Sequence, residues 1–96
     1  MIASFKDRRT EDLYHGRSSN RVRRIPPDVG DSALRKMDMI QAAANLTDLR
    51  TPPGNRLEAL RGNLKGFHSI RINDQWRIIF RWNAREALDV EIIDYH

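Results

Sequence analysis

The chain has 96 residues, 40% of them hydrophobic and 31% charged, which suits one domain with a small core and excludes disorder throughout the chain. It contains no cysteine, so disulfides, thiolate catalysis and cysteine–zinc sites are excluded. The net charge is +4 and 14 of the 17 basic residues are arginine, which binds phosphate and stacks on bases, so nucleic acid is the natural class of partner.

The first 24 residues predict only short elements. Residues 2–6 alternate in polarity and predict a short strand, and residues 7–16 predict a helix of one or two turns that Gly16 ends. Residues 17–24 (RSSNRVRR) hold four arginines and a single aliphatic residue. This composition predicts a mobile connection that becomes ordered on a partner.

A long helix is predicted after the Pro26-Pro27 pair. Proline is tolerated in the first helical turn, and Asp28 or Asp31 can cap the free amides there. We expect the helix to run toward Leu49, because apolar side chains recur every three or four residues and form one core-facing stripe. The stripe consists of Ala33, Leu34, Met37, Ile40, Gln41 and Ala44.

Residues 51–55 (TPPGN) break the helix, and four segments with alternating apolar residues follow. The segments are residues 56–61, 68–72, 75–82 and 87–95, and the turns between them are residues 62–66, 73–74 and 83–86. Strands joined by such short turns pair antiparallel, and the helix covers one face of their sheet. The sequence therefore predicts an α+β fold, with an antiparallel sheet of four or five strands and N-terminal helices packed on one face.

The two faces of the third segment differ in chemistry. Because side chains alternate along a strand, one face is predicted to pack on the helix. That face carries Trp76, Ile78, Phe80 and Trp82. Arg77 and Arg81 point to the opposite, open face, as does Arg71 of the preceding strand. Arg71 and Arg77 flank a tight turn, so we expect them to clamp one phosphate. An ion pair with a carboxylate across the sheet is the simpler expectation for Arg81, and a merely solvated surface is the alternative for the whole set.

Two further segments carry candidate residues. Residues 62–66 (GNLKG) lack the lysine–serine pair of a phosphate-binding loop and predict a hairpin turn, from which Lys65 can reach a backbone phosphate. At the C-terminal end, Tyr95 can stack on a base or donate a proton, His96 titrates near neutrality, and Asp94 can orient either. The spacing of these groups is not that of metal ligands, so we expect neither a metal nor a cofactor.

Long stretches of this sequence resemble the HigB toxins of the RelE/ParE toxin superfamily, in particular the GraT-like branch. They are PPDVGDSALRKMDMIQAAANLTDLR, PPGNRLEALRGNLKGFHSIRINDQWRIIFRW and DVEIIDYH. The resemblance covers nearly all of residues 1–96 and is weakest over residues 6–24. It implies a single domain with the RelE-like microbial ribonuclease fold. It also implies a toxin of a type II toxin–antitoxin system that enters the ribosomal A site, cleaves messenger RNA and thereby inhibits translation and growth.

The resemblance also implies the chemistry, which is a metal-independent attack of the RNA 2′-hydroxyl on the adjacent phosphate. By motif, Arg71 and Arg77 would stabilise charge on that phosphate, and Asp94, Tyr95 and His96 would position RNA and assist proton transfer. The implied RNA-binding residues are Glu58, Arg61, Lys65 and Arg81. Some HigB proteins have histidine and lysine where this chain has Glu58 and Arg61. Arg61 keeps the charge, whereas the change to Glu58 leaves the general base open between Glu58, Tyr95 and His96.

Family membership further implies the partners. We expect a HigA-type helix-turn-helix antitoxin, operator DNA bound through that antitoxin, and the ribosome with its messenger RNA. Two alternatives are a non-catalytic ribosome or RNA binder and a ParE-like gyrase inhibitor, and the DYH ending with the paired arginines disfavours the second. No apolar stretch approaches the roughly 18 residues of a membrane span, and the N-terminus lacks a signal-peptide core. We therefore expect a cytoplasmic protein without membrane contact.

Overall fold

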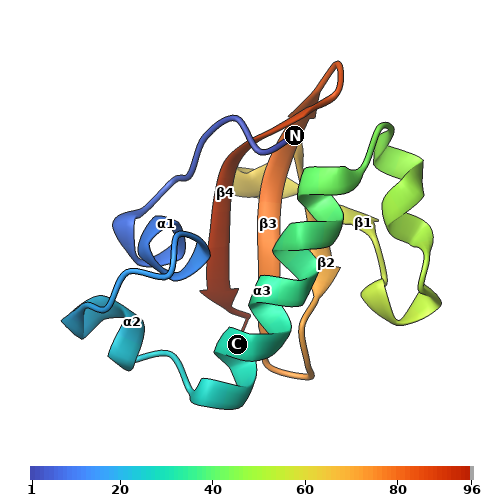
Figure 1. The fold of residues 1–96 in the computed structure, drawn as a ribbon. Helices are drawn as coiled ribbons and strands as arrows, with labels where there is room; N and C mark the ends of the chain where they lie inside the picture. The colour runs from blue at the N-terminus through green and yellow to red at the C-terminus, as the bar shows by residue number, and fades with distance from the viewer. Residues whose placement is uncertain (96) are drawn as a thin grey trace.

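The computed structural model describes residues 1–95 and has the α+β architecture that the sequence predicts (Figure 1). The helices are α1 (Arg8–Tyr14), α2 (Asn20–Arg23) and α3 (Pro27–Ala42), and the strands are β1 (Glu58–Ala59), β2 (Phe67–Arg71), β3 (Trp76–Asn83) and β4 (Glu86–Asp94). The strands lie in the order β1-β2-β3-β4, and each pairs antiparallel with the next. The predicted meander is confirmed. No helix within residues 1–95 is long and apolar enough to cross a membrane.

Helix α3 lies across one face of the sheet and supplies Val29, Ala33, Met37 and Ile40 to the core (Figure 1). Ala33, Met37 and Ile40 are fully buried against the sheet, as the predicted stripe requires. The helix ends at Ala42, earlier than predicted, and Gln41 is exposed. The Asp48 carboxylate accepts hydrogen bonds from the two backbone amides just before a short 3-10 helix, η1 (Leu46–Arg50). These two hydrogen bonds hold the chain in a turn, so α3 does not continue beyond Ala42.

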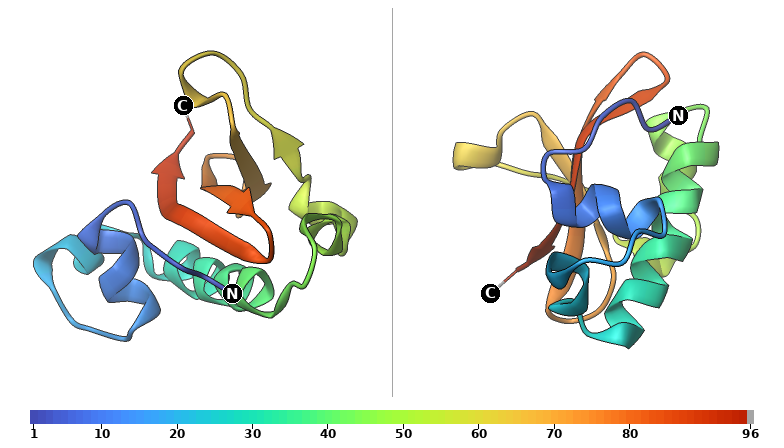
Figure 2. Two further views of the ribbon diagram at one scale, coloured as in Figure 1. Left: turned by 90° about the horizontal axis from the view of Figure 1, so that it is seen from above. Right: turned by 60° about the vertical axis from the view of Figure 1, so that its left-hand side comes forward.

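The N-terminal segment packs along the outer side of β4 without forming a fifth strand. Ile2 and Phe5 make isolated bridges to Ala87 and Val90, so the strand predicted at residues 2–6 is reduced to two contacts. Figure 2 shows α1 and α2 grouped beside the sheet, at the N-terminal side of α3. Within residues 1–95 the sheet therefore has four strands.

Residues 17–24 contain helix α2, so the segment has more secondary structure than its composition suggests, and its mobility stays a prediction. Ser19 caps α2 by accepting a hydrogen bond from the backbone amide of Val22. Val22 packs against the core, and Ile25 directly after the segment is buried. One cap and two apolar contacts thus support a short helix in a segment whose composition is otherwise that of a solvated loop.

The middle of the sheet is fully buried on its helix-facing side. Ile70, Ile78, Phe80 and Ile92 are inaccessible to solvent there. His68 lies on the same side with its ring 6.2 Å from that of Phe80, and burial lowers the pKa of the His68 imidazole. His68 is therefore a packing residue.

The opposite side of the sheet is less open than the sequence predicts. Ser69 and Ile79, in the middle of that side, are almost completely buried, and Arg77 is 8% exposed. A β-bulge between Ile79 and Arg81 bends β3 against β4. The β1–β2 connection, with the 3-10 helix η3 (Gly62–Leu64), projects away from α3 on this side (Figure 2). Accessible positions on this side thus lie at the ends of the sheet and along its β1 edge.

Candidate active site

Strand pairing gathers the predicted site residues at one end of the sheet. Arg71 of β2 lies directly opposite Arg77 of β3, and Trp76 lies opposite Asp94 of β4. The chain continues from Asp94 to Tyr95, whose backbone amide donates to the Gln75 carbonyl at 2.6 Å. The β2–β3 turn therefore holds both arginines and Tyr95 close together.

A hollow of about 170 Å³ lies at this end of the sheet. Its lining residues are Arg56, Glu58, Arg71, Asn73, Asp74, Arg77 and Tyr95. Arg71, Arg77, Tyr95 and Glu58 are predicted site residues that the structure brings together. A second, wider hollow of about 710 Å³ continues from Glu58 and Tyr95 along β1 to Arg61. The two hollows form one polar surface, which we call the β1 groove.

Arg77 is the most constrained cation of the hollow. Its Nη1 and Nη2 atoms both donate to Glu58 Oε1 at 3.2 Å, and Nη2 also donates to the Arg56 carbonyl at 3.3 Å. The guanidinium carbon lies 5.2 Å from the centre of the Tyr95 ring. The buried Nε atom has no hydrogen-bond partner among residues 1–95. The prediction of a solvent-exposed Arg77 is wrong, because Glu58 and Tyr95 cover its side chain from two sides.

Glu58 is one of the two acidic residues that line the hollow, and the other is Asp74. The Glu58 side chain is 53% exposed, and only one of its carboxylate oxygens bonds to Arg77. A guanidinium normally receives a carboxylate through two parallel, short hydrogen bonds. The contact between Glu58 and Arg77 is therefore long and one-sided, which leaves the carboxylate free to rotate toward an incoming group.

Arg71 sits at the rim of the hollow and pairs with Asp74 of the same turn. Its charge also acts on Lys36 of α3. Burial, followed by the positive charges of Arg35 and Arg71, lowers the pKa of the Lys36 ammonium group. Cations from α3 and β2 thus converge beside the hollow, and the field there favours a bound anion.

Arg56 is a site residue that the sequence reasoning missed. It follows Asn55, which is fully buried and donates to the backbone carbonyls of Leu49 and Thr51 while accepting from Lys36. Arg56 itself has a left-handed backbone, with φ of 47°. The signal in the sequence was Asn55 after the proline–glycine break, since asparagine often satisfies the backbone of such turns.

The remaining predicted residues are distributed as follows. The Asp94 carboxylate accepts from Gln75 Nε2 at 2.9 Å and does not line the hollow. Arg61 lines the outer part of the β1 groove, and Lys65 is exposed at the end of η3. His96 lies outside the described residues. Arg81 pairs with Asp89 across the sheet at 2.8 Å, which confirms the simpler expectation for it.

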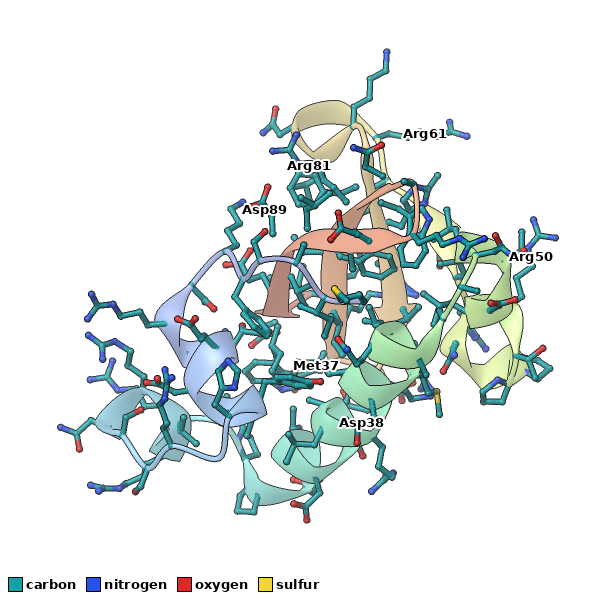
Figure 3. All side chains as sticks on the ribbon, turned by 45° about the horizontal axis from the view of Figure 1, so that its top comes forward. Met37, Asp38, Arg50, Arg61, Arg81 and Asp89 are labelled. Atoms are coloured by element: carbon teal, nitrogen blue, oxygen red, sulfur yellow. The ribbon has the colours of Figure 1, made fainter. Side chains whose placement is uncertain are left out.

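The far end of the sheet carries a second group of charged side chains. Figure 3 shows Arg61, Arg81 and Asp89 at the end of the molecule away from Met37 and Asp38 of α3. Within residues 1–95, histidine and acidic side chains form no cluster of three or more that could hold a metal ion. The charged groups that do converge at the hollow are mainly cationic, which suits a phosphate.

The sequence and the fold both have known relatives. Residues 3–96 match the family described as HigB-like toxin, a RelE-like toxin of type II toxin–antitoxin system HigB. "Toxin HigB-1" of Vibrio cholerae serotype O1 is 46% identical over 89 residues, which cover 93% of this chain and 92% of that protein. An uncharacterized protein of Haemophilus influenzae is 41% identical over 64 residues, 67% of this chain and 63% of that one.

A chain of the YoeB-YefM complex from Staphylococcus aureus has the same fold. It superposes with a TM-score of 0.62 over 100% of this chain and 98% of that chain, at 14% sequence identity. At that identity the likeness concerns the fold alone, and the family assignment rests on the sequence match. This chain therefore belongs to the HigB-like family of RelE-like toxins from type II toxin–antitoxin systems.

Proposed function

We propose that this toxin is a ribosome-dependent endoribonuclease that cleaves messenger RNA in the A site. The observation that carries the proposal is the hollow that Arg56, Arg71 and Arg77 line together with Glu58, whose carboxylate pairs with Arg77. A carboxylate held by a guanidinium group occupies the kind of position that a backbone phosphate takes in an RNA complex. Substrate binding would move Glu58 aside and place the scissile phosphate between the arginines.

The reaction we propose is an internal transesterification. The RNA 2′-oxygen forms a bond to phosphorus while the bond from phosphorus to the 5′-oxygen breaks, which leaves a 2′,3′-cyclic phosphate and a 5′-hydroxyl. Glu58, displaced from Arg77, accepts the proton of the 2′-hydroxyl, and His96 gives a proton to the departing 5′-oxygen. Arg71 and Arg77 stabilise the negative charge that develops on the phosphate oxygens. Because arginines supply this positive charge, the proposed mechanism uses no metal ion.

The other predicted residues receive positioning roles. Tyr95 is 46% exposed beside Arg77, so one face of its ring is available to stack on a base next to the scissile phosphate. Asp94 steadies the β2–β3 turn through Gln75. Arg61 in the β1 groove, with Lys65 beyond it, supplies cations along the path of a single RNA strand.

Messenger RNA cleavage on programmed ribosomes tests the proposal. Purified toxin is added to ribosomes that hold a defined messenger RNA, and the RNA ends are mapped. We expect cuts confined to the A-site codon, with 5′-hydroxyl and cyclic phosphate ends, and no cutting of the same RNA free in solution. Ribosome binding without any cut would favour the non-catalytic alternative. Inhibition of DNA supercoiling by gyrase, with intact messenger RNA, would favour the gyrase alternative.

We also propose that the partner is a HigA-type helix-turn-helix antitoxin, and that the pair binds its own operator DNA through the antitoxin. Membership of a type II toxin–antitoxin family supports this. Co-expression of the toxin with the neighbouring reading frame is expected to yield a complex that neutralises the toxin and shifts an operator fragment, while toxin alone leaves the fragment unshifted. A toxin that shifts the fragment unaided, or that recovers no neighbour, contradicts the assignment.

A further inference from the structure

A separate hollow of about 390 Å³ opens at the opposite end of β3 and β4 from Arg77. Its lining residues are Gly66, Arg81, Trp82, Asn83, Leu88 and Asp89. The bulge creates it, because Asp89 has a left-handed backbone (φ 53°) and the register shift sets Leu88 opposite Arg81. Gly66, also left-handed with φ of 93°, leaves open space where a Cβ would stand. The lining of the hollow therefore combines the polar side chains of Arg81, Asn83 and Asp89 with the apolar side chains of Leu88 and Trp82.

Within this hollow, contacts to Asp89 and Phe67 hold the planar guanidinium group of Arg81 in one orientation. Its Nε and Nη2 atoms donate to Asp89 Oδ2 at 3.1 and 2.8 Å. The guanidinium carbon also lies 5.4 Å from the centre of the Phe67 ring, whereas 57% of the side chain is exposed. Bases of single-stranded RNA stack on arginine planes, and a plane that is already held loses little entropy when it binds.

The same contacts argue against a phosphate as the ligand. Asp89 already neutralises Arg81 with two hydrogen bonds, so a phosphate would have to displace it and would meet its negative charge. An uncharged, planar ligand keeps the pair intact. Asn83 is exposed, and its side-chain amide makes no hydrogen bond within residues 1–95. The Asn83 amide offers both a hydrogen-bond donor and a hydrogen-bond acceptor, and the edge of a nucleobase can pair with both.

We propose that this hollow binds one unpaired nucleobase of the messenger RNA, stacked on Arg81 and read along its edge by Asn83. The inference rests on the proposed function, since it assigns a second contact to the same RNA. Arg77 and Arg81 are four residues apart on the same strand, so the base lies roughly 13 Å from the scissile phosphate. A few nucleotides cover that distance along the β1 groove. Base preference at that one nucleotide then follows from Asn83, Leu88 and Trp82.

Abasic scanning on programmed ribosomes tests the inference without needing cleavage. The messenger RNA carries a 2′-deoxynucleotide at the scissile position, which blocks attack, and a single abasic nucleotide is moved through the neighbouring positions. Toxin affinity is measured for each RNA. We expect one position, separated from the scissile bond, at which base removal weakens binding by about 5- to 150-fold, the usual worth of one stacked base.

Arg81→Leu is the decisive variant. It should weaken binding to intact RNA and abolish the penalty at that one position, because the surface on which the base stacks is gone. Asn83→Ala should keep the stacking penalty and lose discrimination between the four bases there. Arg85→Leu is the matched control: it removes an exposed arginine of the adjacent turn that does not line the hollow, so it should retain the full penalty. Thermal melts of all variants verify folding.

Two results overturn the inference: no penalty at any position apart from the scissile bond, or an equal penalty in Arg81→Leu and in the wild type. Cleavage of unmodified messenger RNA is followed in parallel, so the two proposals fail separately. A position-specific penalty without cleavage removes the proposed nuclease function and retains the base site. Cleavage without a position-specific penalty supports the proposed nuclease function and removes the base site.

Discussion

Replacing Arg77 by alanine is expected to slow messenger RNA cleavage by roughly 100- to 1,000-fold, the usual cost of removing one donor aimed at charge in a transition state. Arg77 is held by the Arg56 carbonyl and the Tyr95 ring, and both contacts remain when Glu58 moves aside, so the guanidinium group needs little reorganisation during the reaction. Single-turnover cleavage on programmed ribosomes measures the effect. Arg77→Lys should recover only part of the rate, because lysine keeps the charge and lacks the planar fork.

Arg77→Ala should also lower the free energy of unfolding, whereas replacing an exposed arginine would leave it nearly unchanged. Arg77 is buried, so its removal leaves the Arg56 carbonyl without this donor and opens space beneath Tyr95. We expect a loss of about 1–3 kcal/mol in the free energy of unfolding. Arg85→Ala, an exposed change in the β3–β4 turn, should alter neither stability nor rate. If Arg77→Ala cleaves at the wild-type rate but melts earlier, the arginine is purely structural and the site assignment fails.

The second large effect is expected for Glu58→Gln, which should separate binding from chemistry. As the proposed base, Glu58 contributes roughly 100- to 10,000-fold to the rate, and an amide cannot accept the proton. The same change removes a negative charge from Arg77, so affinity for uncleavable messenger RNA should rise. Measuring the maximal cleavage rate and the dissociation constant side by side distinguishes these effects.

Glu86→Gln provides the control for Glu58→Gln, since it removes an exposed carboxylate on β4 at the other end of the sheet. It should leave both rate and affinity unchanged. An unchanged cleavage rate in Glu58→Gln would assign the base to Tyr95 or His96 instead. A lower rate with unchanged affinity would mean that the carboxylate does not compete with the phosphate.

The sequence predicts the sheet well because its signals are local. Alternation from residue 67 to residue 94 and the short turns determine which strands pair, and the pairing in turn places Arg71 beside Arg77. Alternation also assigns each side chain to a face of the sheet. It carries no information on what covers that face, which is why the burial of Arg77 by Glu58 and Tyr95 was missed.

Features that depend on single distant contacts escaped prediction. Arg56 reaches the hollow because Asn55 is anchored to α3 and η1, a contact between segments 6 and 19 residues apart. Helix α3 ends early because Asp48 binds the amides before η1. The short helix within residues 17–24 depends on the Ser19 cap and on the packing of Val22, and Arg17 pairs with Asp12 of α1. None of these contacts leaves a periodic pattern in the sequence.

The Glu58 carboxylate, tethered beside Arg77, acts as a built-in competitor present at a high effective concentration, on the order of millimolar or above for a group on a short tether. Inorganic phosphate, nucleotides and stray RNA in free solution must compete with it as separate molecules. A messenger RNA strand immobilised in a ribosome presents its phosphate at a comparably high local concentration. The ribosome already holds the RNA in position, so little further entropy is lost when the phosphate is aligned with Arg77. Under the proposed function, intramolecular competition of this kind gives a small, highly basic toxin a physical reason to ignore abundant anions and to act only where its substrate is held in place.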